Sequence, residues 1–267
     1  MIVYNEKDEN KNLSNIARNI FFAIFLPILI LVLWEWAADT GRINGNVIPP
    51  PYKLAETFVQ LVSSGKLVQG LLISFERVIV GFLIASIVGI TLGFLMGLFA
   101  PINKMLSSLV NILRPIPVIA LIPIFIIILG IGEAANISII IIGALWPILL
   151  NTLAGVLSVD RKLLEVAYVY GISRKKTIFR IILPSALYHI LTGLRLGIGG
   201  AWVSVVAAEM IGATSGIGYM IMFAKSLAQA SNMYVLVLVI GVIGFLIDRI
   251  LLLFQNHISK RFAGGGN

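Results

Sequence analysis

The sequence predicts an all-α integral membrane protein with about six transmembrane helices and both termini in the cytoplasm. Of its 267 residues, 59% are apolar and only 12% are charged, whereas a typical soluble domain has about 25% charged residues. Long apolar runs recur along the chain, and such runs are typical of membrane-spanning helices. Because the chain has too few polar residues to cover a soluble core, an ordinary soluble enzyme and a disordered chain are both excluded.

Six apolar segments are expected to cross the membrane: 20–38, 76–98, 105–131, 135–157, 184–212 and 233–254. The first is expected to stay attached, because Glu35 and Trp36 stand where a signal peptidase requires small residues. Residues 39–73 are predicted to form an external loop with a short amphipathic surface helix over 54–64. The remaining chain divides into a cytoplasmic tail over 1–19, a bundle core over 74–256 and a second cytoplasmic tail over 257–267.

Small residues and prolines give two of these spans particular roles. Gly89, Gly93 and Gly97 recur every four residues, which places them on one helix face and predicts close contact with a neighbouring helix. Pro115 and Pro117 lie in a segment whose prolines should break a regular helix. Broken helices at membrane depth often line a transport pathway, although a kinked packing helix is the alternative.

The positions of the basic residues predict the orientation. Four of them, Arg42, Lys53, Lys66 and Lys225, fall in loops on one side of the predicted spans. Thirteen fall on the other side, which is therefore cytoplasmic: Lys7, Lys11, Arg18, Lys104, Arg114, Arg161, Lys162, Arg174, Lys175, Lys176, Arg180, Lys260 and Arg261. This distribution explains the net charge of +8, so no nucleic-acid partner is expected.

Two ionisable residues inside the fifth span are candidates for a pathway or gate. Arg195 and Glu209 are separated by fourteen residues, about 21 Å along a helix, so they cannot pair with each other. Arg195 could contact an anion in transit, or it could hold Asp248 or a backbone carbonyl, and we favour a structural role. Glu209 precedes an outer segment that contains glycine and is expected to be flexible, and a role in gating, in docking or in polar packing is left open.

Metal and nucleotide sites are not predicted. The chain has no cysteine and only two histidines, which excludes a thiolate metal site, a cysteine nucleophile and a histidine-rich metal cluster. We expect no metal site and assign no catalytic residue. Its only Gly-Lys pair, Gly65-Lys66, lacks the upstream glycine and the following hydroxyl residue of a phosphate-binding loop. We therefore expect no cofactor to be bound by this chain.

The loop over 158–183 carries the most information about function. Leu163, Leu164, Ala167 and Tyr168 have the spacing of one face of a short amphipathic helix, and Gly171 is a natural helix terminator. A second, basic helix should then run to Pro184. Such a helix pair could lie on anionic lipid headgroups, or it could dock into a groove on a soluble partner.

This loop resembles the "EAA loop" of ATP-binding cassette (ABC) importer permeases. The matching residues are Glu165, Ala167, Gly171, Ile181, Leu183 and Pro184, at the family's spacing. Val166 departs from the family's usual alanine. Residues 114–133 and 191–221 resemble the nitrate, sulfonate and taurine permease subfamily, which also includes transporters of a pyrimidine precursor of thiamine. The likeness covers roughly residues 50–256.

The resemblance implies a MetI-like permease bundle in the inner membrane of a prokaryote and no enzymatic activity of its own. Two copies would pair, and each would dock its loop into one of two ABC ATPase subunits, which use the ATP. An external binding protein would deliver a small anion of the sulfonate, taurine or nitrate type. The alternatives are import of the thiamine pyrimidine, an ion-gradient-driven secondary transporter and a membrane scaffold without transport activity.

Overall fold

The structure is a computed structural model that describes residues 25–263. These residues form helices joined by short links, with no strand among them. A helix over 25–39 comes first. It is followed by α2 (Pro51–Ser63), α3 (Lys66–Leu98), α4 (Ala100–Leu113), α5 (Val118–Leu129), α6 (Glu133–Leu157), α7 (Arg161–Val169), α8 (Arg174–Thr177), a π-helix η1 (Ile178–Ile182), α9 (Leu183–Gly212), α10 (Ile217–Ser226) and α11 (Ala230–Ala263).

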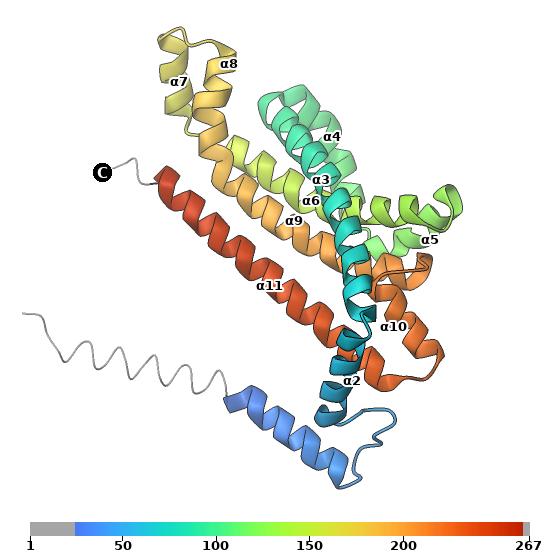
Figure 1. The fold of residues 1–267 in the computed structure, drawn as a ribbon. Coiled ribbons are helices and arrows are strands. Elements are labelled where there is room, and N and C mark those ends of the chain that lie inside the picture. The colour runs from blue at the N-terminus through green and yellow to red at the C-terminus, as the bar shows by residue number, and fades with distance from the viewer. Residues whose placement is uncertain (1–24, 264–267) are drawn as a thin grey trace, which may run out of the picture.

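Helices α3, α6 and α9 form the centre of the bundle, with α11 running beside α9 (Figure 1). The main apolar core joins these four helices through Val78, Ile148, Trp202 and their neighbours. The C-terminal ends of α3, α6 and α11 lie at the same end of the bundle as α7 and α8, whereas α2 and α10 lie at the other end (Figure 1). The predicted orientation makes the first of these ends cytoplasmic and the second external.

The predicted glycine contacts are confirmed. A Cβ atom on Gly93 would lie 2.7 Å from Cβ of Thr152, and one on Gly97 would lie 2.5 Å from Cγ1 of Val156. A Cβ on Gly89 would likewise come within 2.9 Å of Ile148. Since real Cβ contacts are longer than this, the three glycines allow α3 and α6 to pack along their length at a separation that a side chain would prevent.

Four of the six predicted spans appear as long apolar helices, α3, α6, α9 and α11. The third predicted segment, 105–131, is a pair of helices, α4 and α5, bent by 98° at their junction. The first predicted span begins outside the described residues, and its described part is the helix over 25–39. The count of six spans and the orientation of the termini stay predictions.

Two helix boundaries and one outer segment differ from the sequence-based expectation. The surface helix begins at Pro51 rather than at 54, because Pro at the first helical position is preorganised for a helix. The outer segment after Glu209 contains a helix, α10, where we expected a flexible stretch. Helix α11 continues to Ala263, through most of the segment assigned as the tail over 257–267.

Substituting Gly93 with Val should lower the stability of the bundle, because the new side chain must displace Thr152 and the backbone of α6. Overpacking of this kind costs about 1–3 kcal/mol. Thermal unfolding of the purified protein in detergent measures the loss. Gly199→Val is the matched control, since Gly199 lies in α9 and a Cβ there would meet no atom of another element within 4 Å. Equal melting temperatures for the two variants would contradict the close packing of α3 on α6.

Candidate functional site

A buried ion cluster centred on Arg77 joins three helices towards the external end of the bundle. Nη1 of Arg77 on α3 donates to Oε1 of Glu209 on α9 at 2.8 Å. Nε donates to Oε2 of Glu133, the first residue of α6, at 2.8 Å, and Nη2 bonds the other oxygen of the same carboxylate. The side chains of Arg77 and Glu209 are 4% and 0% exposed, whereas that of Glu133 is 61% exposed.

The same cluster fixes the start of α10. Backbone N–H of Gly218 donates to Oε2 of Glu209, and that of Ile217 donates to Oγ of Ser74, both at 2.9 Å. The Ser74 hydroxyl in turn lies 2.8 Å from Oε1 of Glu209. The negative carboxylate of Glu209 thereby lies at the positive, N-terminal end of α10. The N–H groups at this helix start, which would otherwise lack partners, are hydrogen-bonded.

The link before α10 is also bound to Arg77. Its Nη1 and Nη2 donate to the main-chain oxygen and the hydroxyl of Ser215, at 2.8 and 2.9 Å. Gly216 has φ +104°, and a Cβ there would lie 2.2 Å from Oε1 of Glu209. Glycine is therefore required at this position for both its backbone conformation and its lack of a side chain.

Arg195 holds Asp248, one of the structural partners that the sequence left open. Its Nε and Nη2 donate to the two carboxylate oxygens at 2.8 and 2.9 Å, which ties α9 to α11. A second bond between the same helices, from Nε2 of Gln255 to Oγ1 of Thr192, measures 2.7 Å. Arg195 and Glu209 therefore belong to two separate ion clusters.

Pro115 and Pro117 lie in the link between α4 and α5, where the chain turns by 98°. Both are exposed, and Pro117 immediately precedes the first residue of α5. Their fixed φ angles and missing N–H groups account for the bend. They take part in neither ion cluster, and their candidacy as pathway residues stays a prediction.

The loop over 158–183 folds as the predicted pair of short helices. The side chain of Asp160 caps α7 by accepting from N–H of Lys162 at 2.9 Å. Beyond the other end, Gly171 has φ +63°, and a Cβ there would meet no atom within 4 Å. The glycine is therefore needed for its left-handed backbone and not for space.

The bonds around Gly171 form a Schellman motif. N–H of Gly171 donates to the carbonyl of Tyr168 at 3.0 Å, and N–H of Ile172 donates to that of Ala167 at 2.9 Å. These bonds satisfy carbonyls that the helix end would leave without partners. They also set the direction in which the chain turns back into α8.

Helix α7 is buried on one side and exposed on the other. Ala167 is 2% exposed, whereas Val169 and Tyr170 are 79% and 78% exposed and the Glu165 side chain faces outward. Ile181 and Leu183 pack against the cluster of Val156, Val159 and Ile182 that anchors the hairpin to the bundle. The matched loop residues therefore divide into an anchoring set and an outward-facing set.

The hairpin is continuous with α9 through the π-helix η1. N–H of Leu183 donates to the carbonyl of Ile178, five residues back. Pro184 follows at the start of α9 and has no N–H of its own. A π turn widens the helix just where the proline ring would clash with the carbonyl of Arg180.

Sequence reasoning did not select Arg77, Glu133 or Ser74 as site residues. One signal was present in the sequence: Arg77 lies inside an apolar span. A charged residue in such a position needs a partner. Its partners are 56 and 132 residues away, and no local spacing connects them.

Comparison with known proteins identifies the chain's relatives. Residues 89–264 match the family described as "Binding-protein-dependent transport system inner membrane component". The chain belongs to that family. Its members are inner-membrane transport subunits, so the chain is a prokaryotic-type multi-pass membrane protein and not an enzyme.

Several relatives of this permease cover most of the chain. A putative ABC transporter permease of Methanocaldococcus jannaschii is 40% identical over 87% of this chain and 88% of its own. A putative aliphatic sulfonates transport permease of Bacillus subtilis is 35% identical over 89% and 86%. A taurine transport system permease of Escherichia coli is 31% identical over 97% of both chains.

The fold is that of the permease in a solved structure described as an inward-facing MetNI methionine ABC transporter. The TM-score is 0.66, at 20% sequence identity, over 73% of this permease and 97% of that chain. The expected MetI-like architecture is therefore confirmed. At this identity the likeness concerns the fold alone.

Replacing Arg77 with Met should strongly destabilise the permease, because the buried Glu209 carboxylate would lose its charged partner. Breaking a buried pair in this way costs about 3–5 kcal/mol. Unfolding in detergent, followed by tryptophan fluorescence, measures the change. Arg195→Met is the comparison variant, because it removes an arginine from the pair with Asp248, whose side chain is 48% exposed. The loss of stability in this variant should therefore be smaller. A larger loss for Arg195→Met would contradict the central place of the Arg77 cluster.

Proposed function

We propose that this permease is the membrane subunit of an ABC importer that moves a small anion across the inner membrane. It works as a pair of identical copies, with two ATPase subunits on the cytoplasmic side and an external binding protein that delivers the substrate. ATP is bound and hydrolysed by the ATPase subunits. The observation that carries the proposal is the α7–α8 hairpin with its exposed apolar side chains at the predicted cytoplasmic end.

The outer side of α7 has the character of a docking surface. Val166, Tyr168, Val169 and Tyr170 are all more than half exposed, although they lie on a loop outside the long apolar helices. Neighbouring exposed apolar side chains of this kind are typical of an interaction site. Tyrosine is also common at the centres of protein interfaces. A groove on an ATPase would bury this face.

The α7–α8 hairpin can transmit a movement of such a partner to α9. Its inner side packs against the ends of α3, α6 and α9, and the Schellman motif fixes its turn. From Arg174 the chain runs as a helical stretch to Gly212, interrupted only by the π turn. Movement of the docked hairpin therefore passes directly into α9, and opening the pathway alternately to each side would follow from that movement.

The relatives support a small anionic substrate. The permeases from Bacillus subtilis and Escherichia coli are named for aliphatic sulfonates and for taurine, both of which carry a sulfonate group. We therefore place the substrate of this permease among small sulfonates and similar anions, nitrate included. The thiamine pyrimidine is the comparison substrate that distinguishes this proposal from its nearest alternative.

Gly171→Asp should leave the permease inserted in the membrane but abolish its association with the ATPase. The substitution strains the left-handed residue at the end of α7 and places a negative charge at the negative end of that helix. Co-purification from native membranes in mild detergent, with mass spectrometry of the partners, measures the association.

Gly41→Asp is the matched control, since Gly41 has φ +69° and equally open surroundings. It belongs to the link that leads into α2, and α2 lies at the opposite end of the bundle from α7 (Figure 1). A wild-type amount of ATPase bound to the Gly171 variant would overturn the docking role of the hairpin.

Transport by the complete complex tests the proposal as a whole. Proteoliposomes that contain the permease, its ATPase and its binding protein should accumulate ethanesulfonate, taurine or nitrate only when ATP is supplied. A protonophore should leave the initial rate unchanged. Uptake that needs an ion gradient and no ATP would replace the importer with a secondary transporter, and uptake of the pyrimidine alone would replace the anion.

A further inference from the structure

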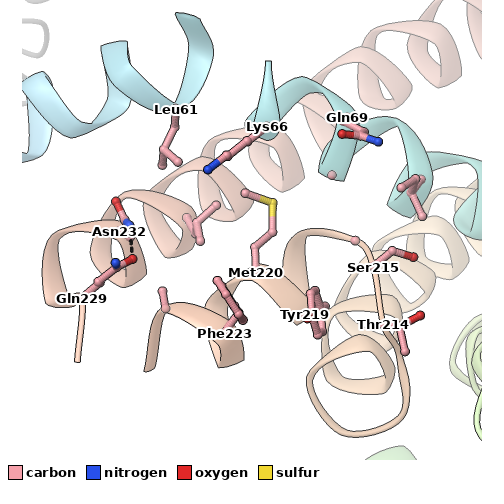
Figure 2. Close-up of a pocket in the computed structure, with 15 residues that line it drawn as sticks. Leu61, Lys66, Gln69, Thr214, Ser215, Tyr219, Met220, Phe223, Gln229 and Asn232 are labelled. Atoms are coloured by element: carbon pink, nitrogen blue, oxygen red, sulfur yellow. Dashed lines mark hydrogen bonds between the residues drawn. The ribbon is translucent and has the colours of Figure 1, made fainter. Parts of the chain in front are cut away.

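A cavity of about 350 Å³ opens at the predicted external end of the permease, between α2, α3, α10 and α11 (Figure 2). Lys66 and Gln69 from the first turn of α3 contribute to one wall. Met220 and Phe223 of α10 form the opposite wall, and Gln229 and Asn232 stand at the start of α11. This volume is near the lower end of the range for small-molecule pockets, about 300–1,000 Å³.

The lining combines one positive charge, several neutral polar groups and an apolar side. Lys66 is the cation, and none of the described residues that line the cavity is acidic. Thr214, Gln69 and Tyr219 supply hydroxyl and amide groups, whereas Leu61, Met220 and Phe223 supply apolar surface. Nδ2 of Asn232 donates to Oε1 of Gln229 at 2.6 Å, which fixes two polar side chains at the edge (Figure 2).

Lys66 is available for a ligand, whereas Arg77 is not. The guanidinium of Arg77 is already bonded to two carboxylates and to Ser215. Within the described residues, no acidic side chain forms an ion pair with Lys66. A cation of this kind, at the rim of a partly apolar cavity, is suited to an oxyanion.

Two neighbouring cavities fit such a ligand less well. One lies beside Arg77 and is lined by Glu76 and Glu133, whose negative charges would repel an anion. The other contains Lys53 and shares Gln229 and Asn232 with the first, but its lining lacks large apolar side chains. Only the Lys66 cavity, among these three, offers a cation, neutral donors and an apolar wall together.

The floor of the Lys66 cavity is tied to the Arg77 cluster. Ser215 and Gly216 line the cavity, and Ser215 accepts two hydrogen bonds from Arg77. Oε2 of Glu209 binds the N–H of Gly218 just beyond this floor. A ligand in the cavity therefore rests on the segment that joins α9 to α10.

We propose that this cavity is an external binding subsite for a small organic oxyanion, such as a short alkyl sulfonate. The oxyanion contacts Lys66 and the neutral donors, and the alkyl group lies against Leu61, Met220 and Phe223. The subsite rests on the proposed function, because it assigns the first place on this permease where the imported anion is held. A phospholipid headgroup carries the same oxyanion chemistry, so the test must separate the two sources.

Equilibrium binding of ethanesulfonate to the permease–ATPase complex in phosphatidylcholine nanodiscs tests this subsite without the binding protein. Titration calorimetry of the wild type should show saturable binding. Lys66→Met should weaken it by about tenfold, the loss expected for one charged hydrogen bond, and Lys66→Arg should restore most of it. Lys225→Met is the matched control, because Lys225 lies in the last turn of α10 but does not line the cavity.

The outcomes separate the subsite from the proposed function. Absence of saturable binding to the wild type, or equal weakening in the Lys66→Met and Lys225→Met variants, would overturn the subsite, while ATP-driven uptake in proteoliposomes would still uphold the importer. If nanodiscs with phosphatidylglycerol abolish ethanesulfonate binding, the cavity takes a lipid headgroup and the substrate assignment fails. Equal affinity in both lipids, with loss confined to Lys66→Met, supports the proposal.

Discussion

The carboxylate of Glu209 has no exposed surface, and the external end of the bundle is arranged to satisfy it. A buried charge is costly unless it is paired and hydrogen-bonded. Here the pairing comes from Arg77 of α3, and further hydrogen bonds come from Ser74 of α3 and from Gly218 at the start of α10. Arg77 then extends the network to Glu133 of α6 and to Ser215. This one requirement therefore links α3, α6, α9 and α10 at the external end of the bundle.

Features that depend on local residue chemistry could be predicted from the sequence. The spacing of Gly89, Gly93 and Gly97 predicted a close helix contact, and those glycines meet α6. Gly171 was expected to end a helix, and its left-handed backbone does so. The four long spans followed from apolar length alone. In each case the predictive pattern is a residue spacing or an apolar length that can be read within a few turns of the chain, although the helix that the glycines meet could not be named from that pattern.

Features that depend on contacts between distant segments could not be predicted in this way. Arg77 is separated from Glu209 by 132 residues, so no local sequence pattern predicts that these two residues pair. Helix α10 was missed because its sequence is short and contains glycine, and its start is satisfied by Glu209 and Ser74 from other helices. The sequence left several partners possible for Arg195, and in the structure the partner is Asp248 on α11. That pairing depends on the packing of α9 against α11, which the sequence alone does not give.

The length of α9 sets the scale of any movement that begins at its η1 end. The helix contains 30 residues and is therefore about 45 Å long. A tilt of about 5° around Leu183 would displace the far end by about 4 Å, by simple geometry from that length. The hydrogen bonds of Glu209 to Arg77 and Gly218 measure 2.8 and 2.9 Å, and they cannot stretch by that amount. A tilt of α9 therefore either carries α3 and α10 with it as one body or ruptures the ion cluster.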